Sequence, residues 1–176
     1  MHNRLLRISF CFLISLNLFG CETTKKIFEV ISDPNVPVGY PSENPTEVTL
    51  TFLSGEDINQ NQEGEASPIE LQVIYLNEDS HFLSANYDQL LIEGPEKALG
   101  KNYVDHQDYT LLPDQYKILP PLKINEKTRF IGVIAHYGDI NNSYWADIAE
   151  VEAIGKKATY LIHIKANEVL IKKEEK

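Results

Sequence analysis

The chain has 176 residues, with 26 acidic and 16 basic side chains, and a formal net charge of −10. This acidic excess repels polyanions, and no Lys/Arg cluster interleaved with aromatic residues offsets the repulsion, so we expect no nucleic acid partner. Both cysteines, Cys11 and Cys21, lie near the N-terminus. The folded part must therefore be stabilised by burial and strand pairing rather than by disulfides.

The N-terminus predicts an export signal that ends at a lipid-modified cysteine. Arg4 and Arg7 form a basic start, residues 8–19 are mostly apolar, and the small Gly20 precedes Cys21. This pattern is typical of a bacterial lipoprotein signal peptide, residues 1–20, that is cleaved before the cysteine. The apolar run is shorter than the roughly 20 residues that a helix needs to cross a bilayer. A plain cleaved signal and a retained anchor are the alternatives to lipidation at Cys21.

Residues 21–45 predict an extended tether between the lipid and a folded domain. Their prolines alternate with Asn, Ser and Gly, a composition that disfavours regular structure. Alternatively, residues 27–31 form a short helix or strand against the domain. Residues 46–176 then make one domain of ordinary size. The tether prolines are Pro34, Pro37, Pro41 and Pro45.

The domain begins with two predicted strands joined by a long polar loop. Apolar and polar residues alternate over residues 46–53 and again over residues 68–76, which indicates strands with one buried face. Between them, residues 54–66 are polar, acidic and glycine-bearing. This loop is longer than the two to five residues usual in a β-hairpin.

A short helix and further strands follow in the second half of the chain. Ser84 is a suitable N-cap for a helix over residues 85–92, and Gly94-Pro95 ends it. The most apolar of the later segments, residues 129–137, should lie centrally in a sheet. Seven or eight short strands with one helix and no βαβ rhythm predict a mainly β, two-sheet β-sandwich. The other predicted strands span residues 108–112, 116–122, 144–152 and 158–171, the last with a hairpin turn at Asn167-Glu168.

The histidines do not predict a metal centre or a catalytic site. His81, His106, His136 and His163 fall on separate predicted elements without a recognised ligand spacing. No nucleophile elbow, P-loop or dinucleotide fingerprint occurs in the sequence. We therefore expect no metal, no cofactor and no enzymatic activity, and we expect His136 to be packed or hydrogen-bonded within its strand.

Three further residues have structural interpretations. Gly132 lies inside the most apolar predicted strand, where a glycine indicates close packing or a bulge. Tyr144 and Trp145 are interpreted as core or sheet-face aromatic residues, with a binding platform as the alternative.

Several segments in the same order resemble the TssJ family, the outer-membrane lipoproteins of the type VI secretion system. The run over residues 66–76 resembles the family's Ser-Pro strand, residues 82–90 its short helix and residues 97–100 its Ala-Leu-Gly turn. Residues 112–115 resemble its Leu-x-Pro turn, and residues 130–139 its Leu-Gly-Val-Val-Ala strand, with Trp145 after it. Gln72 and Gly138 stand where the family has Arg, and Asp114-Gln115 replaces Gly-Glu. These departures affect salt bridges at these positions and not the fold.

The resemblance implies a transthyretin-like β-sandwich that is lipid-anchored to the outer membrane and faces the periplasm. It implies a non-enzymatic role: binding the periplasmic C-terminal region of the inner-membrane protein TssM, in an assembly with other copies of the lipoprotein. In the family, the loop between the first two strands contacts the partner. By position, the partner-binding residues are Glu56, Asp57, Ile58, Asn59, Gln60, Asn61, Gln62, Glu63, Gly64 and Glu65.

The acidic side chains of this loop would steer a basic partner, and burial of Ile58 would supply affinity. A solvated connection without a partner is the alternative for the loop. For the whole protein, the alternative function is a lipid-anchored sandwich module that binds a small ligand or glycan, which would need a concave pocket with exposed aromatic residues.

Overall fold

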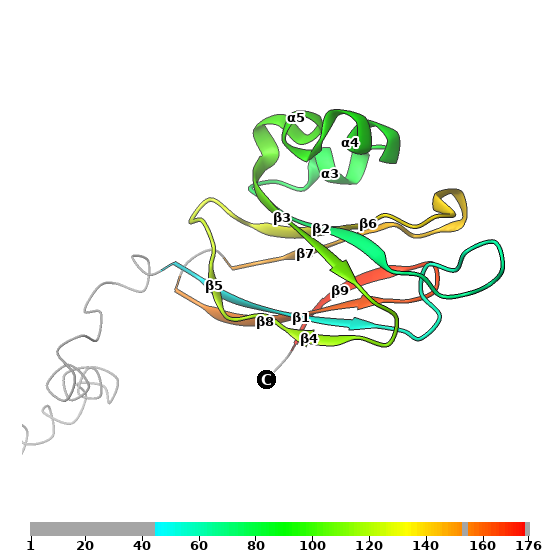
Figure 1. Ribbon diagram of the computed structural model, residues 1–176. Helices are drawn as coiled ribbons and strands as arrows, with labels where there is room; N and C mark the ends of the chain where they lie inside the picture. The colour runs from blue at the N-terminus through cyan, green and yellow to red at the C-terminus, as the bar shows by residue number, and fades with distance from the viewer. Residues whose placement is uncertain (1–44, 153–154, 175–176) are drawn as a thin grey trace, which may run out of the picture. The chain divides into compact units, whose positions relative to one another are not determined.

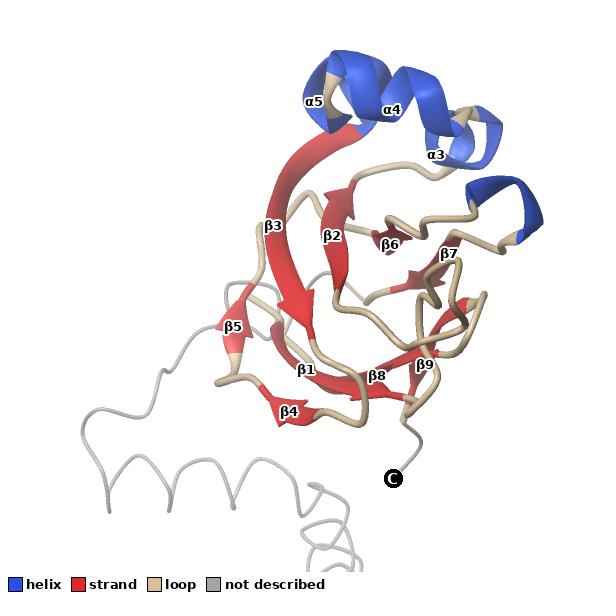
Figure 2. Ribbon diagram, turned by 45° about the vertical axis from the view of Figure 1, so that its right-hand side comes forward, coloured by secondary structure: helices blue, strands red, loops and turns tan. Residues whose placement is uncertain are grey.

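The computed structural model describes residues 45–152 and 155–174. The predicted signal peptide, Cys21 and the tether up to residue 44 lie outside the described residues. Within the described part, two β-sheets lie face to face, and a layer of short helices covers the outer side of one of them (Figures 1 and 2). The predicted two-sheet, mainly β fold is confirmed.

The first sheet has the order β4-β1-β8-β9, with β5 also pairing with β1. β1 and β8 are parallel although most of the domain separates them in sequence, and their register runs from Glu47 opposite Lys157 to Ser54 opposite Ile164. The strands are β1 (Glu47–Ser54), β4 (Tyr116–Ile118), β5 (Leu122–Lys123), β8 (Lys157–Ile164) and β9 (Val169–Lys173).

The second sheet is antiparallel and has the order β3-β2-β6-β7. β6, the most apolar strand, pairs on both sides, as predicted for residues 129–137. Its backbone polar groups are satisfied by neighbours on either edge, so it needs no solvent. The strands are β2 (Ile69–Leu76), β3 (Tyr103–Leu111), β6 (Phe130–Ala135) and β7 (Ala146–Glu150).

The helical layer lies between β2 and β3 in sequence. The predicted helix is α4 (Tyr87–Glu93), and its N-cap is Asn86 rather than Ser84, because the Asn86 side chain accepts a 2.7 Å hydrogen bond from the backbone of Gln89. It is one of three α-helices in this layer. The other helical segments are α3 (Ser80–Ser84), α5 (Pro95–Leu99), η3 (Gly100–Asn102) and, between β6 and β7, η4 (Ile140–Asn142).

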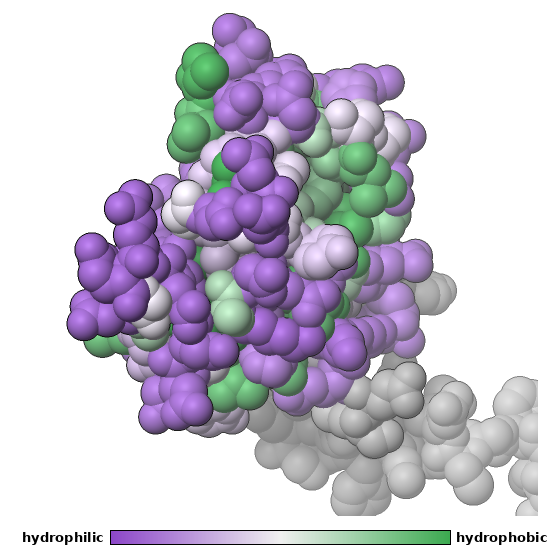
Figure 3. Space-filling model, turned by 90° about the vertical axis from the view of Figure 1, so that its right-hand side faces the viewer, coloured by the Kyte–Doolittle hydropathy of each residue, from purple (hydrophilic) through white to green (hydrophobic). Residues whose placement is uncertain are grey.

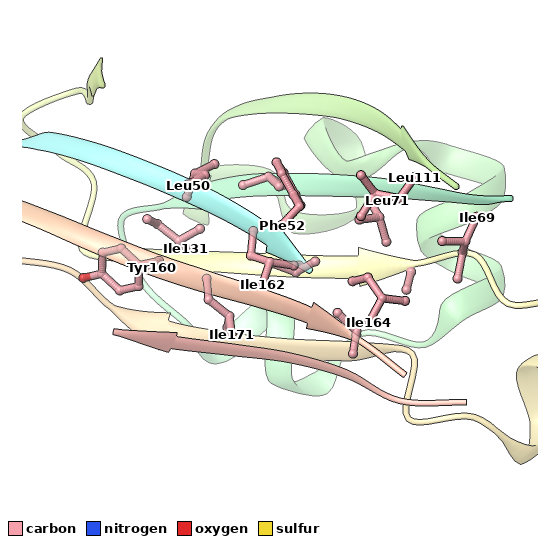
Figure 4. Packing of buried hydrophobic residues seen from close by; sticks show 14 of the residues in the cluster. Leu50, Phe52, Ile69, Leu71, Leu111, Ile131, Tyr160, Ile162, Ile164 and Ile171 are labelled. Atoms are coloured by element: carbon pink, nitrogen blue, oxygen red, sulfur yellow. The ribbon is translucent and has the colours of Figure 1, made fainter. Parts of the chain in front are cut away.

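Two hydrophobic clusters hold these layers together. The larger fills the space between the sheets with the alternating inward residues of every long strand, such as Leu50, Phe52 and Ile162 (Figure 4). The smaller lies between the second sheet and the helices, where Ile74 and Leu76 of β2 meet apolar helical side chains. β2 is therefore buried on both faces along its second half, which explains why its alternation breaks down there.

Candidate protein interface

The predicted partner-binding loop projects from one end of the sandwich. It connects the end of β1 to the start of β2, and it lies beside the β6–β7 and β8–β9 connections (Figures 1 and 2). β1 spans eight residues, about 25 Å at the usual rise of a strand. The loop is therefore separated by the length of β1 from the end at which the chain enters the domain.

The base of the loop belongs to the folded core. Ile58 is 0 % exposed and packs in the cluster between the sheets. Backbone hydrogen bonds hold it there, from Ser67 to the Ile58 carbonyl (3.1 Å) and from Gly55 to the Ile164 carbonyl (2.9 Å). The expectation that Ile58 buries itself against a partner is therefore wrong, because its side chain already stabilises the domain itself.

Asn59 fastens the loop to the neighbouring connections. Its side-chain amide donates to the Pro68 carbonyl (2.8 Å), and its side-chain oxygen accepts from the Gly138 N–H (2.8 Å). Its own N–H donates to the Ala166 carbonyl (3.2 Å). Its φ of +47° lies in the left-handed region, which Asn tolerates better than most residues. The backbone and side chain of one residue thus join three connections.

The tip of the loop is organised by Asn61. The Asn61 side-chain oxygen accepts hydrogen bonds from the backbone N–H groups of Glu63 (3.0 Å) and Glu65 (2.9 Å). The Asn61 N–H donates to the Glu65 carbonyl (2.9 Å), which closes the turn. This Asx-type geometry fixes the backbone of the tip before any partner arrives.

The outer surface of the loop is acidic and exposed to solvent. Of the ten residues predicted to bind a partner, Ile58 is buried and Asn59 is half-buried, while the other eight are exposed. Asp139 on the adjacent β6–β7 connection adds negative charge. In the four connections at this end (residues 55–68, 112–115, 136–145 and 165–168), Lys165 is the one Lys or Arg, and it pairs with Glu168 at 2.7 Å. Figure 3 shows this end face-on as largely hydrophilic.

A depression of about 380 Å³ lies where the three connections meet. Its walls include Asn59 and Asn61 from the predicted loop, and the other connections supply residues that the sequence analysis missed. The polar Gly-Asp and Asn-rich turns were a signal for an exposed surface, but only the fold brings them beside the loop. The missed residues are Tyr137, Asp139, Asn142, Ser143, Ala166 and Asn167.

His81, His106 and His136 make separate hydrogen bonds. His136 Nδ1 bonds the Tyr87 hydroxyl at 2.8 Å, and burial lowers the pKa of His136. His106 Nδ1 bonds the Tyr103 hydroxyl at 2.7 Å. Within residues 45–152 and 155–174, no group of three or more potential ligands is arranged around a common metal position. No helix of this described part has the length and apolar character to span a bilayer.

The sequence of residues 46–168 matches the family described as "Type VI secretion lipoprotein, VasD, EvfM, TssJ". No curated protein matches the chain. Among solved structures, the T6SS lipoprotein TssJ1 from Pseudomonas aeruginosa is similar, with a TM-score of 0.69 and 23% identity over 75% of this chain and 98% of that chain. Serratia marcescens Lip, a membrane bound component of the Type VI Secretion System, has a TM-score of 0.65 and 21% identity over 75% of this chain and 99% of that chain.

A further match is to a structure described as the T6SS protein TssM C-terminal domain (869–1107) from EAEC. It has a TM-score of 0.58 and 20% identity over 71% of this chain and 99% of the matched chain. At these identities the three structures show a shared fold.

Proposed function

Because the chain belongs to the type VI secretion lipoprotein (TssJ) family, we propose that it anchors a type VI membrane complex to the outer membrane by binding the periplasmic C-terminal region of TssM. The observation that carries this proposal is the acidic, preorganised loop end, which lies one strand length away from Glu47, where β1 begins.

One of the matched structures supports TssM as the partner. Its description names residues 869–1107 of TssM, yet 71% of this 176-residue chain covers 99% of the matched chain. The matched chain is therefore much shorter than that TssM fragment. This length difference favours the interpretation that the matched chain is a companion protein with the present fold, in a structure whose description names TssM.

The anchor follows from the predicted lipid on Cys21. Each buried methylene contributes about 0.8 kcal/mol, so several acyl chains on one cysteine hold the protein firmly to a membrane, whereas a single chain holds it marginally. We place the anchor in the outer membrane and the domain in the periplasm. In enterobacterial lipoproteins, an Asp directly after the lipidated cysteine favours retention in the inner membrane. This chain has Glu22 there instead of Asp, which favours the outer membrane.

The charges of the loop end suggest how binding begins. Exposed carboxylates attract a basic surface over a distance of about a Debye length and so raise the association rate more than they raise the affinity. A fixed loop backbone reduces the entropy lost on binding. The loop therefore acts as an orienting element, and other surfaces must supply the apolar contacts.

Deletion of residues 60–65 tests the proposal. The Ser67 N–H donates to the Ile58 carbonyl (3.1 Å) just outside the deletion, so its two ends, Asn59 and Ala66, lie close together and can be rejoined. Ile58 and Asn59 remain to hold the base. We expect the deleted protein to lose binding to the purified TssM C-terminal region while its melting temperature stays near that of the wild type. Undiminished binding would refute the role of the loop.

A charge variant distinguishes the effect of the loop carboxylates on association from the effect of the loop's shape. Glu63→Gln combined with Glu65→Gln removes two exposed charges and keeps the backbone, so the association rate should fall and become less sensitive to salt. The control is Glu96→Gln combined with Glu126→Gln, which removes two exposed charges elsewhere on the domain. Equal effects from the two pairs would show that net charge, rather than the loop, steers the partner.

A further inference from the structure

A second surface, next to the acidic loop end, is apolar. A groove of about 290 Å³ runs between α3 and the edge strand β7. Figure 3 shows hydrophobic surface beside the hydrophilic loop end. The groove is lined by Phe82, Leu83, Ala85, Ser143, Tyr144, Trp145, Ala146, Asp147 and Ile148.

The floor of the groove is held in place from below. Trp145 packs edge-on against Tyr87, with ring centroids 5.4 Å apart, and the Tyr87 hydroxyl bonds His136 at 2.8 Å. Phe82 is 5 % exposed and lies on Gly132 of β6. These contacts fix the aromatic rings in one arrangement, so a partner would not have to order them.

Two exposed apolar side chains form the rim. Leu83 is 66 % exposed and Tyr144 is 73 % exposed. The backbone of Tyr144 is nevertheless fixed on both sides, because its N–H donates to the Asn167 carbonyl (2.9 Å) and its carbonyl accepts from the Val169 N–H (3.0 Å). An exposed aromatic ring on a fixed backbone is the type of residue that dominates the binding energy of protein interfaces.

The groove is continuous with the loop end and shares its charge. Ser143 lines both the groove and the depression beside Asn59. The one charged residue of the groove is Asp147, whose carboxylate accepts hydrogen bonds from the backbone N–H groups of Ile148 (2.9 Å) and Ile171 (2.8 Å). The groove is apolar, contains one carboxylate and lies beside an acidic surface. It therefore complements an apolar side chain that is flanked by positive charge.

We infer that this groove is the apolar half of the interface whose acidic half is the β1–β2 loop. The inference rests on the proposed function, and it assigns the groove one occupant: a segment of the same TssM region that carries a bulky aliphatic or aromatic side chain next to Lys or Arg. The acidic loops orient this segment, and the groove supplies the contacts that keep it bound.

Rim variants test the groove in binding measurements with the TssM C-terminal region. Tyr144→Ala and Leu83→Ser change exposed side chains, so both variants should fold normally. Each should raise the dissociation rate and weaken binding about fivefold or more, the range of an interface residue worth over 1 kcal/mol. The salt dependence of association should remain that of the wild type. The matched control is Ile118→Ser on β4, which is 57 % exposed and lies outside the groove.

The outcomes separate the two proposals. If the wild type binds and both rim variants bind equally well, the groove inference is wrong and the proposed function stands. If the wild type does not bind the TssM region at all, both fail. A wild type that dimerises in sedimentation experiments, with Tyr144→Ala monomeric, would assign the groove to a second copy of this chain and overturn the inference.

Discussion

Gly132 lies directly against the ring of Phe82. A Cβ atom placed on Gly132 would lie 2.6 Å from Phe82 Cε2 and 2.8 Å from Cζ, closer than side-chain atoms approach in folded proteins. β6 thus carries a glycine at its centre because α3 places an aromatic ring on that face of the sheet. The expectation of close packing at this position is confirmed.

Gly132→Ala should therefore destabilise the domain. Overpacking of a full core costs about 1–3 kcal/mol in unfolding free energy, because Phe82 must leave its rotamer or α3 must move. Urea denaturation measures the change. Gly138→Ala is the control, since the nearest atom to its added Cβ is 3.6 Å away, and it should be close to neutral. Adding Phe82→Leu to Gly132→Ala should recover part of the loss, and strict additivity would contradict the contact.

Ile58→Ala should lower the unfolding free energy by about 2–5 kcal/mol, the cost of emptying a fully buried aliphatic position. Its side chain is 0 % exposed although it belongs to the polar loop. Gln60→Ala, two residues away and exposed, should change stability little. Equal chemical-denaturation midpoints for the two variants would show that the base of the loop is not part of the core.

Asn59→Ala should destabilise the loop end by about 1–3 kcal/mol, since removal of its side chain leaves the Gly138 N–H and the Pro68 carbonyl without these bonds. Alanine is also disfavoured at the φ of +47°. Asn59→Gly removes the same bonds but tolerates this φ. The melting temperature should therefore be highest for the wild type, lower for Asn59→Gly and lowest for Asn59→Ala. The reverse order of the two variants would contradict a backbone strain at this position.

The stability of the domain should fall as pH drops below the ordinary pKa of histidine, about 6.5. Burial lowers the pKa of His136 in the folded state, and this outweighs the attraction of Glu70 and Asp108, which act in the opposite sense. The unfolded chain then binds the proton more readily than the folded chain, so acidification favours unfolding.

Urea unfolding at pH 7.5 and pH 5.5 measures this effect. His136→Gln should reduce the difference between the two pH values. Glu47 and Glu152, whose pKa values are lowered by paired lysines, titrate below this window and do not interfere. A wild type that gains stability at pH 5.5, relative to the variant, would reverse the sign and refute the assignment.

Tyr144 and Trp145 illustrate where reasoning from sequence needs the fold. Both were expected in the core or on a sheet face. Trp145 does pack between the two clusters, but Tyr144 lies before β7 and points its ring outward. Adjacent residues at the end of a strand face opposite sides, and only the position of α4, whose Tyr87 packs on Trp145, decides which side is buried.

The helical layer and the edge strands show a second limit. α3 and α5 have five residues each, too few for a helical period to appear in the sequence. β3 begins at Tyr103 rather than near residue 108 because its polar first half is held by pairing with β2 and needs little burial. The predicted strand over residues 116–122 is divided into β4 and β5 around Pro120 and Pro121, which have no N–H for the ladder.

The sequence by itself determined which segments are strands and which loop is long, polar and acidic, because alternation and turn composition are local properties of the chain. The order of the segments also indicated the family. The tertiary structure alone decided that β1 pairs with β8, that Ile58 belongs to the core, and that the acidic loop meets the Tyr144 groove. These depend on contacts between residues far apart in sequence, and their energies come from packing and shared hydrogen bonds that no single segment encodes.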